Sequence, residues 1–301
     1  MMVAAPALAG RMPAVADRGP VDLPFSEADF ARIAAFAHRE FGLNLQASKK
    51  DLVYSRLIKR LRALGLADFD SYCRLIETAD GAQEREALTS ALTTNVTHFF
   101  REGHHFELLA NLAVKPQLAA LKAGRRLRLW SAGCSAGMEP YSIAMTLLDA
   151  LPEAAQLNIR ILATDVDRAI LDRAQAALYA EEETRPIPDR MKPQAIARAP
   201  DGQMRILPKI TQMVRFAELN LMQDWPVRGP FDAIFCRNVA IYFDKPTQAR
   251  LWQRFATLLA PDGLLFIGHS ERLNGPAEAT FTSVGVTAYR KTGSMTGPVP
   301  A

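Results

Sequence analysis

The sequence predicts an α/β fold, in which a mostly parallel sheet covered by helices follows a small all-helical domain and is interrupted by an antiparallel β insertion. Three observations support this prediction. The first third of the chain shows only helical periodicity, the region from Arg125 alternates apolar strand-like runs with helix-like segments, and a proline-rich stretch between Tyr179 and Val214 breaks the alternation. The length of 301 residues and the 49% hydrophobic content suffice for two domains.

The N-terminal domain is expected at residues 24–92. Its first helix begins after Ser26, a residue type that favours the N-cap, and ends at Gly42. Apolar residues recur along it at helical spacing, at Phe30, Ile33, Ala34, Ala37 and Phe41. Further helices are expected at 48–64, 69–77 and 82–93. Residues 1–23 are rich in Ala and Pro and lack a basic n-region, so we expect a disordered tail there rather than a signal peptide.

A linker and helix are expected at 93–124, followed by the α/β domain at 125–291 and a second tail at 292–301. Strands of the α/β domain are expected at 126–130, 159–163, 231–235 and 264–267. Helices are expected at 139–150, 168–177 and 246–259. Residues 281–290 are expected to add an antiparallel strand. The insertion, about 180–213, is expected to form a small antiparallel lobe with a turn at Asp201-Gly202.

The sequence disfavours a membrane-spanning protein and a disulfide-stabilised one. No run approaches the roughly 18 to 20 apolar residues of a membrane span, and Cys73, Cys134 and Cys236 lack the spacing of a disulfide framework. We therefore expect a cytoplasmic protein without membrane insertion. The formal net charge of +4 and the pI near 9.0 allow acidic partners without requiring them.

The loop from Ser131 to Tyr141, which follows the first strand, suits a ligand site, because ligands of open α/β sheets bind outside the carboxyl ends of the strands. Gly133 and Gly137 let the backbone approach a ligand closely. The loop is neither GxGxxG nor GxxxxGK[ST], which disfavours a dinucleotide or ATP. An ordinary strand-to-helix turn is the alternative interpretation.

Polar residues also follow the later strands. After the second strand, Asp165 can accept hydrogen bonds from ribose hydroxyls, and Asp167 is expected to cap the next helix, although either could simply be a cap. Residues 218–221 can hold an adenine edge. Arg237 and Asn238 follow the third strand, where their burial is costly unless a polar group is bound.

Six segments, in order over roughly residues 25–290, are similar to one family: Asn95–Arg101, Trp130–Tyr141, Ala163–Asp165, Leu219–Leu221, Phe235–Phe243 and Gly268–Glu271. The sequence thereby resembles the chemotaxis receptor glutamate O-methyltransferases of the CheR type. The resemblance implies a Rossmann-like sheet that binds S-adenosyl-L-methionine (SAM), and transfer of its methyl group to glutamate carboxylates of methyl-accepting chemotaxis receptors for sensory adaptation. The products would be glutamate methyl esters and S-adenosyl-L-homocysteine (SAH), made by a cytoplasmic enzyme recruited to receptor arrays.

The resemblance assigns the SAM contacts to Asn95, Thr97, Arg101, Glu139, Asp165, Asn220, Leu221, Arg237 and Asn238. Glu139 would then lie near the cationic amine of the cofactor. Two positions depart from the family pattern. Met138 stands where a second acid is more common, and Ala240 stands where a larger apolar residue is usual, which is expected to loosen the packing beside the site. Neither departure removes an assigned contact.

Arg101 and Tyr242 are the expected catalytic residues. A free glutamate, with a pKa near 4.3, is ionised at neutral pH, so the reaction requires alignment and exclusion of water rather than a general base. Arg101 can pair bidentately with the carboxylate of the cofactor or of the substrate. Tyr242 would place a hydroxyl near the methyl group, unless it is only a core aromatic. His104 and His105 suggest a metal site, but adjacent helical residues diverge, so we expect a surface pair and no metal.

A basic face is expected on the second helix, formed by Lys49, Arg56, Lys59, Arg60 and Arg62. Such a face can bind acidic helices, nucleic acid or headgroups, or be merely solvated. The resemblance favours the cytoplasmic helical region of the receptors. Some relatives use the inserted lobe to bind a receptor C-terminal peptide; the lobe is short here, which favours action without that peptide.

Two rival functions remain open. A nucleic-acid methyltransferase would use the same cofactor, but Arg237–Tyr242 replaces the [DN]PPY element and no Cys follows a Pro, so we expect no nucleic-acid substrate. The second rival is a non-catalytic SAM sensor, which an intact cofactor site does not exclude.

Overall fold

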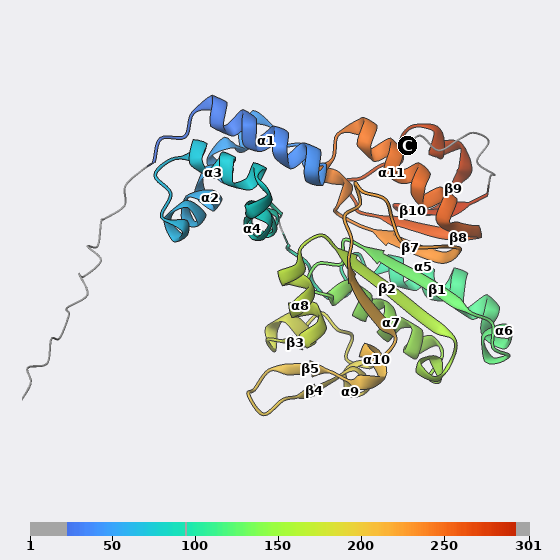
Figure 1. Ribbon diagram of the computed structural model, residues 1–301. Helices are drawn as coiled ribbons and strands as arrows, with labels where there is room; N and C mark the ends of the chain where they lie inside the picture. Colours follow the sequence, from blue (N-terminus) through green and yellow to red (C-terminus); the bar gives the residue numbers. More distant parts are fainter. Residues whose placement is uncertain (1–22, 94, 293–301) are drawn as a thin grey trace, which may run out of the picture.

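The computed structural model describes residues 23–93 and 95–292 (Figure 1). The expected tails at 1–23 and 292–301 therefore lie outside the described residues, apart from one residue of each. In the part that is described, no helix is both long and apolar enough to cross a bilayer.

The helical domain consists of α1 (Glu27–Phe41), α2 (Lys50–Leu64), α3 (Phe69–Glu77) and α4 (Ala82–Leu92), with short 3-10 turns at Ala47–Lys49 and Ala79–Gly81. The predicted helices are confirmed. Ser26 caps α1 in a capping box with Asp29, and Gly42 ends it in the left-handed region at φ 71°. The apolar faces form one core around Ile33, Leu57, Leu61, Tyr72 and Leu88.

The connection to the sheet is more structured than a simple linker. It contains α5 (His104–Leu109), a π-helical turn η3 (Ala110–Val114), the 3-10 turn η4 (Lys115–Gln117) and α6 (Leu118–Lys122). Phe99, Phe106 and Leu109 of this segment are buried in the main core of the α/β domain. The segment before α5 is thereby held against the sheet.

The central sheet has seven strands in the order β6-β2-β1-β7-β8-β10-β9. Its bounds are β1 (Leu127–Ala132), β2 (Ile159–Asp165), β6 (Val214–Glu218), β7 (Phe231–Cys236), β8 (Leu259–Ile267), β9 (Phe281–Gly285) and β10 (Ala288–Lys291). Strands β6, β2, β1, β7 and β8 are parallel, and β10 and β9 are antiparallel. The mostly parallel sheet is confirmed, but residues 281–290, expected as one strand, form a hairpin because the chain turns at Thr287, where φ is 49°.

Helices cover both faces of this sheet, as predicted. Side chains of successive strand residues alternate between two cores: Leu129 and Phe235 pack with α7 (Met138–Ala150) and the connecting helices, whereas Trp130 and Ile234 pack with α11 (Lys245–Leu258). Helix α8 (Arg168–Ala176) packs near β2 and β6. Short 3-10 turns complete the domain at η5 (Ala154–Gln156), η7 (Ala240–Tyr242) and η8 (Pro276–Thr280).

The insertion forms a separate three-stranded antiparallel sheet in the order β3-β5-β4, which confirms the predicted lobe. Its elements are β3 (Leu178–Tyr179), η6 (Glu182–Thr184), α9 (Lys192–Ala195), β4 (Ile196–Arg198), β5 (Met204–Ile206) and α10 (Pro208–Thr211). The turn between β4 and β5 contains Gly202 at φ 85°, at the predicted Asp201-Gly202 position. In Figure 1 the lobe lies at the end of the molecule away from α11.

Candidate functional site

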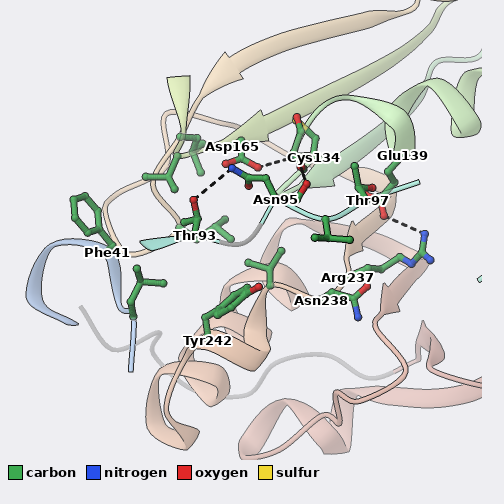
Figure 2. Close-up of a pocket in the computed structure, with 18 of the residues that line it drawn as sticks. Phe41, Thr93, Asn95, Thr97, Cys134, Glu139, Asp165, Arg237, Asn238 and Tyr242 are labelled. Atoms are coloured by element: carbon green, nitrogen blue, oxygen red, sulfur yellow. Dashed lines mark hydrogen bonds and ion pairs between the residues drawn. The ribbon is translucent and has the colours of Figure 1, made fainter. Parts of the chain in front are cut away.

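A pocket that is partly open to solvent lies where the segments after β1, β2, β6 and β7 meet the end of α1 (Figure 2). Every residue that the sequence analysis assigned to cofactor binding or catalysis lines this pocket: Asn95, Thr97, Arg101, Glu139, Asp165, Asn220, Leu221, Arg237, Asn238 and Tyr242. These residues come from segments up to 147 positions apart (242 − 95), and the parallel topology brings them together.

The loop after β1 needs its glycines for packing as well as for access to the pocket. Gly133 and Gly137 have φ of 80° and 84°. A Cβ atom at Gly133 would lie 2.3 Å from Cγ2 of Val239, and one at Gly137 would lie 2.8 Å from Cβ of Ala174. The loop therefore tolerates only glycine at these two positions, and Gly133 also lines the pocket.

Asp165 is fixed by backbone donors. Its Oδ2 accepts a hydrogen bond from the N–H of Ser135 at 2.8 Å, and its Oδ1 accepts one from the N–H of Asp167 at 3.1 Å. Burial raises the pKa of this carboxyl group, although the backbone donors act against the rise. Asp167 caps α8 through the N–H groups of Ala169 and Ile170, as predicted. Of these two carboxylates, Asp165 lines the pocket and Asp167 does not.

Asn95 contacts the same region from the connecting segment. Its side-chain amide donates to Oδ2 of Asp167 at 2.8 Å, and its carbonyl accepts from the hydroxyl of Ser135 at 3.2 Å. Asn95 thus links the segment after α4 to the loops after β1 and β2. In Figure 2 it lies beside Asp165 and Cys134, between the two ends of the pocket.

A buried charge cluster forms one end of the pocket. Arg237, whose side chain is 2% exposed, places Nη1 3.1 Å from Oε2 of Glu139 and Nη2 3.4 Å from Oε2 of Glu102. Arg237 also donates to the carbonyl of Arg101, and Ser131 donates to Oε1 of Glu139 at 2.7 Å. These partners offset the cost of burying a guanidinium at a strand end, which sequence reasoning had attributed to a bound ligand.

The carboxyl groups of this cluster differ in pKa. Burial raises the pKa of Glu139, while Arg237 and Ser131 oppose the rise. For Glu102, burial also favours the neutral form, but Arg237 and the N–H contacts of His269 outweigh it, and the pKa lies below the ordinary value. Sequence reasoning missed Glu102, although it directly follows Arg101.

The expectation that His104 and His105 form a surface pair is wrong for His105, which is fully buried. The two rings lie only 4.2 Å apart between centroids, because both histidines turn their Nε2 toward the carbonyl of Val286. His105 also contacts the hydroxyl of Thr287 and packs near Phe266. Burial lowers its pKa to about 4, so the ring is neutral at physiological pH. No set of three or more metal-ligating side chains gathers among the described residues.

The buried carboxylate of Glu271, a residue that is 4% exposed, anchors the turn after β7. Its carboxylate accepts hydrogen bonds from the N–H groups of Asn238 at 3.1 Å, Ile241 at 3.2 Å and Gly268. Asn238 has φ 59°, and a Cβ atom at Gly268 would lie 2.5 Å from Nδ2 of Asn238. The segment Gly268–Glu271, which the sequence analysis quoted without a role, therefore shapes the turn that carries Arg237, Asn238 and Tyr242.

The two expected catalytic side chains lie on different walls of the pocket. Arg101 is partly exposed, and its Nη1 donates to the carbonyl of Val96 at 3.1 Å. Tyr242 is partly buried and contacts the cores of both domains while lining the pocket. Ala240 is fully buried, and its carbonyl accepts from the amide of Gln248 at 2.8 Å. This short turn is therefore well anchored despite the small residue.

The expected basic face of α2 is smaller than five residues. Arg60 forms a bidentate pair with the buried Glu84, at 3.0 and 2.6 Å, and Tyr72 donates to the same carboxylate. Arg56 donates to the last carbonyls of α4. These two arginines stabilise the helical domain itself. Lys49, Lys59 and Arg62 are exposed, and none of the five lines the pocket.

Comparison with known proteins identifies the family. Residues 28–93 match the all-alpha domain of CheR methyltransferases, and residues 95–290 match their SAM binding domain. A probable chemotaxis protein methyltransferase of Rhizobium etli is 45% identical over 85% of this chain and 96% of its own length. The chemotaxis protein methyltransferase of Escherichia coli is 43% identical over 89% of this chain and 92% of its own length. The chain therefore belongs to the CheR family of SAM-dependent chemotaxis protein methyltransferases.

Proposed function

We propose that this enzyme methylates glutamate side chains of methyl-accepting chemotaxis receptors, giving glutamate methyl esters and SAH. The observation that carries the proposal is the convergence, around one pocket of a CheR-family chain, of every residue that the sequence analysis assigns to cofactor binding or catalysis. The pocket brings carboxylates, a partly exposed arginine and a tyrosine to the carboxyl edge of the sheet, where ligands of such folds bind.

The side chains of the pocket fit SAM in charge. One guanidinium, that of Arg237, is shared by the two carboxylates of Glu139 and Glu102, so this end has an excess of negative charge if both acids are ionised. Asp165 adds a third carboxylate, which is buried and lines the same pocket. A ligand with an ammonium group and a sulfonium would offset the cost of burying these anions. We infer that Glu139 holds the amine and Asp165 holds the ribose hydroxyls.

The chemistry asks little of the side chains beyond alignment and exclusion of water. Bound SAM supplies an electrophilic methyl group on a cationic sulfur. The acceptor glutamate is already ionised at neutral pH. We infer that Arg101, which lines the pocket and is partly exposed, orients this carboxylate by charge-assisted hydrogen bonds, and that the hydroxyl of Tyr242 lines its approach. Because the transfer needs no general base, we assign Glu139 and Asp165 to cofactor binding and not to proton transfer in the reaction.

The cysteines of the α/β domain do not favour a nucleophilic mechanism. Cys134 lines the pocket, but it is buried, and burial raises the pKa of its thiol well above the ordinary value; the same holds for Cys236. A neutral thiol is a poor nucleophile. This supports direct transfer to an oxygen acceptor over the cysteine-dependent methylation of cytosine.

The receptor would be recognised by the helical domain. Lys49, Lys59 and Arg62 are exposed on or beside α2, and we infer that they contact acidic positions of the cytoplasmic receptor helices. The short turn between β4 and β5 favours action without a receptor tail peptide. The enzyme would then act in the cytoplasm at receptor arrays.

The proposal is tested by incubating the enzyme and radiolabelled SAM with receptor-containing membranes, followed by mild alkali. Label on the receptor band that is released as methanol supports a carboxyl methyl ester. Label that resists alkali, or that appears on nucleic acid instead, contradicts the proposed substrate. Tight SAM binding without any labelled acceptor would favour the sensor alternative.

A further inference from the structure

Strand register places three arginines side by side on one face of the central sheet. Arg128 of β1 lies in register with Arg160 of β2, and Arg215 of β6 lies in register with Leu162, two residues beyond Arg160. Neighbouring strands are about 4.8 Å apart, and side chains two residues apart on a strand point to the same face. Leu162 packs with the core on the α11 side of the sheet, so all three arginines point to that side.

These arginines line a groove that is separate from the cofactor pocket. Arg160 and Arg215 are exposed and Arg128 is partly buried. Each of the three is the second residue of its strand, whereas the pocket lies at the carboxyl ends, and the groove and the pocket share no lining residue. In Figure 1, α6, which leads into β1, lies on the side of the molecule opposite the helical domain. A ligand in the groove would therefore leave the pocket free.

The positive charges of the groove have neutral partners. Arg128 donates from Nη1 to the carbonyl of Asn158 at 2.8 Å and from Nη2 to its Oδ1 at 2.7 Å. Arg160 donates to backbone carbonyls at the start of β2. Asp232 lies beside the groove, but its Oδ2 accepts from the backbone N–H of Arg128 at 2.8 Å. Within the described residues, none of the three guanidiniums forms an ion pair with a carboxylate.

The fold alone does not account for this row of like charges. Burial lowers the pKa of Arg128, and repulsion by Arg126 and Arg160 lowers it further. A charged side chain on an edge strand can block unwanted pairing, which accounts for Arg215 on β6. Strands β2 and β1 are interior, so edge protection does not account for Arg160 and Arg128. A bound anion would offset the repulsion among them.

We propose that this arginine groove, formed by Arg128, Arg160 and Arg215, docks an acidic, extended segment of a protein partner. A guanidinium fork pairs with a carboxylate through two parallel hydrogen bonds. Because β6 is the edge strand, an extended segment can also pair with the outer backbone groups of β6. The segment would tether the enzyme to the partner without occupying the cofactor pocket, whatever the methyl acceptor is.

Two other anionic partners fit the groove less well. Single-stranded nucleic acid is held largely by bases that stack on accessible aromatic side chains. Phe231, the aromatic residue that lines the groove, is only 6% exposed. Anionic membranes are typically bound by basic residues on an amphipathic helix or beside a membrane span. The three arginines here lie on strands, and Arg128 is partly buried.

The first test is fluorescence anisotropy, in which a labelled deca-glutamate peptide is titrated with the full chain at about 50 mM salt. The double variant Arg160→Gln/Arg215→Gln is expected to bind the peptide about tenfold more weakly, because two charge-assisted pairs are lost. Arg185→Gln/Arg250→Gln is the matched control, since both residues are exposed, lie outside the groove and give the same change in net charge. It should change the affinity less than twofold. SAH affinity equal to that of the wild type shows that each double variant is folded.

Equal weakening in the two double variants would mean that binding follows net charge alone, and it would overturn the proposal. Absence of binding to the wild-type chain would overturn it as well. Oligothymidylate and vesicles that contain phosphatidylserine are titrated in the same way. If either binds more tightly than the peptide and loses this binding in the groove variant, the groove serves nucleic acid or lipid and the proposed partner is wrong.

The second test needs no variant. Phenylglyoxal modifies accessible arginines, and mass spectrometry gives the rate at each position with and without the peptide. At a peptide concentration of about twice the Kd, about one third of the chain is free, so modification of Arg160 and Arg215 is expected to slow about threefold. Arg185 serves as the internal reference and should keep its rate. Protection at Arg160 and Arg215 no greater than at Arg185 would overturn the proposal.

Discussion

Replacing Glu271 by Gln is expected to disturb the cofactor pocket from outside it. The carboxylate accepts from the N–H groups of Asn238, Ile241 and Gly268, with two of these bonds on Oε2 and one on Oε1. An amide of the same size offers one oxygen and one NH₂ group. Whichever way it turns, its NH₂ group faces at least one backbone N–H, and the turn that carries Arg237, Asn238 and Tyr242 loses an anchor.

The magnitude follows from the number of bonds affected. One buried donor left without an acceptor costs about 1–3 kcal/mol, and the remaining bonds pass from a charged to a neutral acceptor, which roughly halves their strength. We expect urea denaturation to show a loss of about 2–4 kcal/mol in the free energy of unfolding. Because the loss is local to the pocket wall, SAH binding measured by calorimetry should weaken by about tenfold or more.

Glu278→Gln is the matched control. Glu278 is exposed on η8, and among the described residues its side chain forms no hydrogen bond with the turn that Glu271 holds. It should change stability by less than about 0.5 kcal/mol and leave SAH binding unaltered. A Glu271→Gln variant with the stability and the SAH affinity of the wild type would refute the role given to Glu271.

Three further predictions follow from buried ionisable groups. Burial lowers the pKa of His105 to about 4, so on acidification the His105 ring is protonated in the unfolded chain at a higher pH than in the native one. The free energy of unfolding should therefore fall by up to about 3 kcal/mol between about pH 6.5 and pH 4, and urea denaturation of a His105→Gln variant should lack this fall. Arg60→Met should lower stability by about 2–3 kcal/mol, because it leaves Glu84 buried with only Tyr72, whereas Lys59→Met should change it by less than about 0.5 kcal/mol; equal denaturation midpoints would contradict this. Burial raises the pKa of Glu139 in the free protein and a bound ammonium lowers it, so SAH affinity should fall as the pH drops through that pKa, and a pH-independent affinity in calorimetry would contradict the assigned contact.

The local elements could be predicted because their signals are local. Ser26 and Gly42 mark the ends of α1 by cap chemistry, and the strand β7 is a short apolar run that ends at Arg237. Strand β8 starts earlier than expected, at Leu259, because Leu259 already pairs with Phe231 of β7. The Pro261–Gly263 segment, which has the composition of a turn, lies in an irregularity between this pair and the next one, with Asp262 at φ 61°. The pocket residues could be predicted because parallel strands place their following segments at one edge.

Contacts between distant segments could not be predicted. His105 is buried because Val286 and Thr287, about 180 positions further along the chain, turn over it, and no periodicity around residue 105 encodes this. Arg56 and Arg60 belong to a basic run, yet their partners lie on α4. In the sequence, Phe41 is recognisable only as the last apolar residue of an amphipathic helix. It lines the pocket because the helical domain lies against the sheet domain.

A crystal structure of the full chain with SAH tests the central claim most directly. The ligand is expected to lie in this pocket, with its amine at the Glu139 end and its ribose hydroxyls at Asp165. A ligand bound elsewhere, or bound in this pocket with adenine at the Glu139 end, would contradict it.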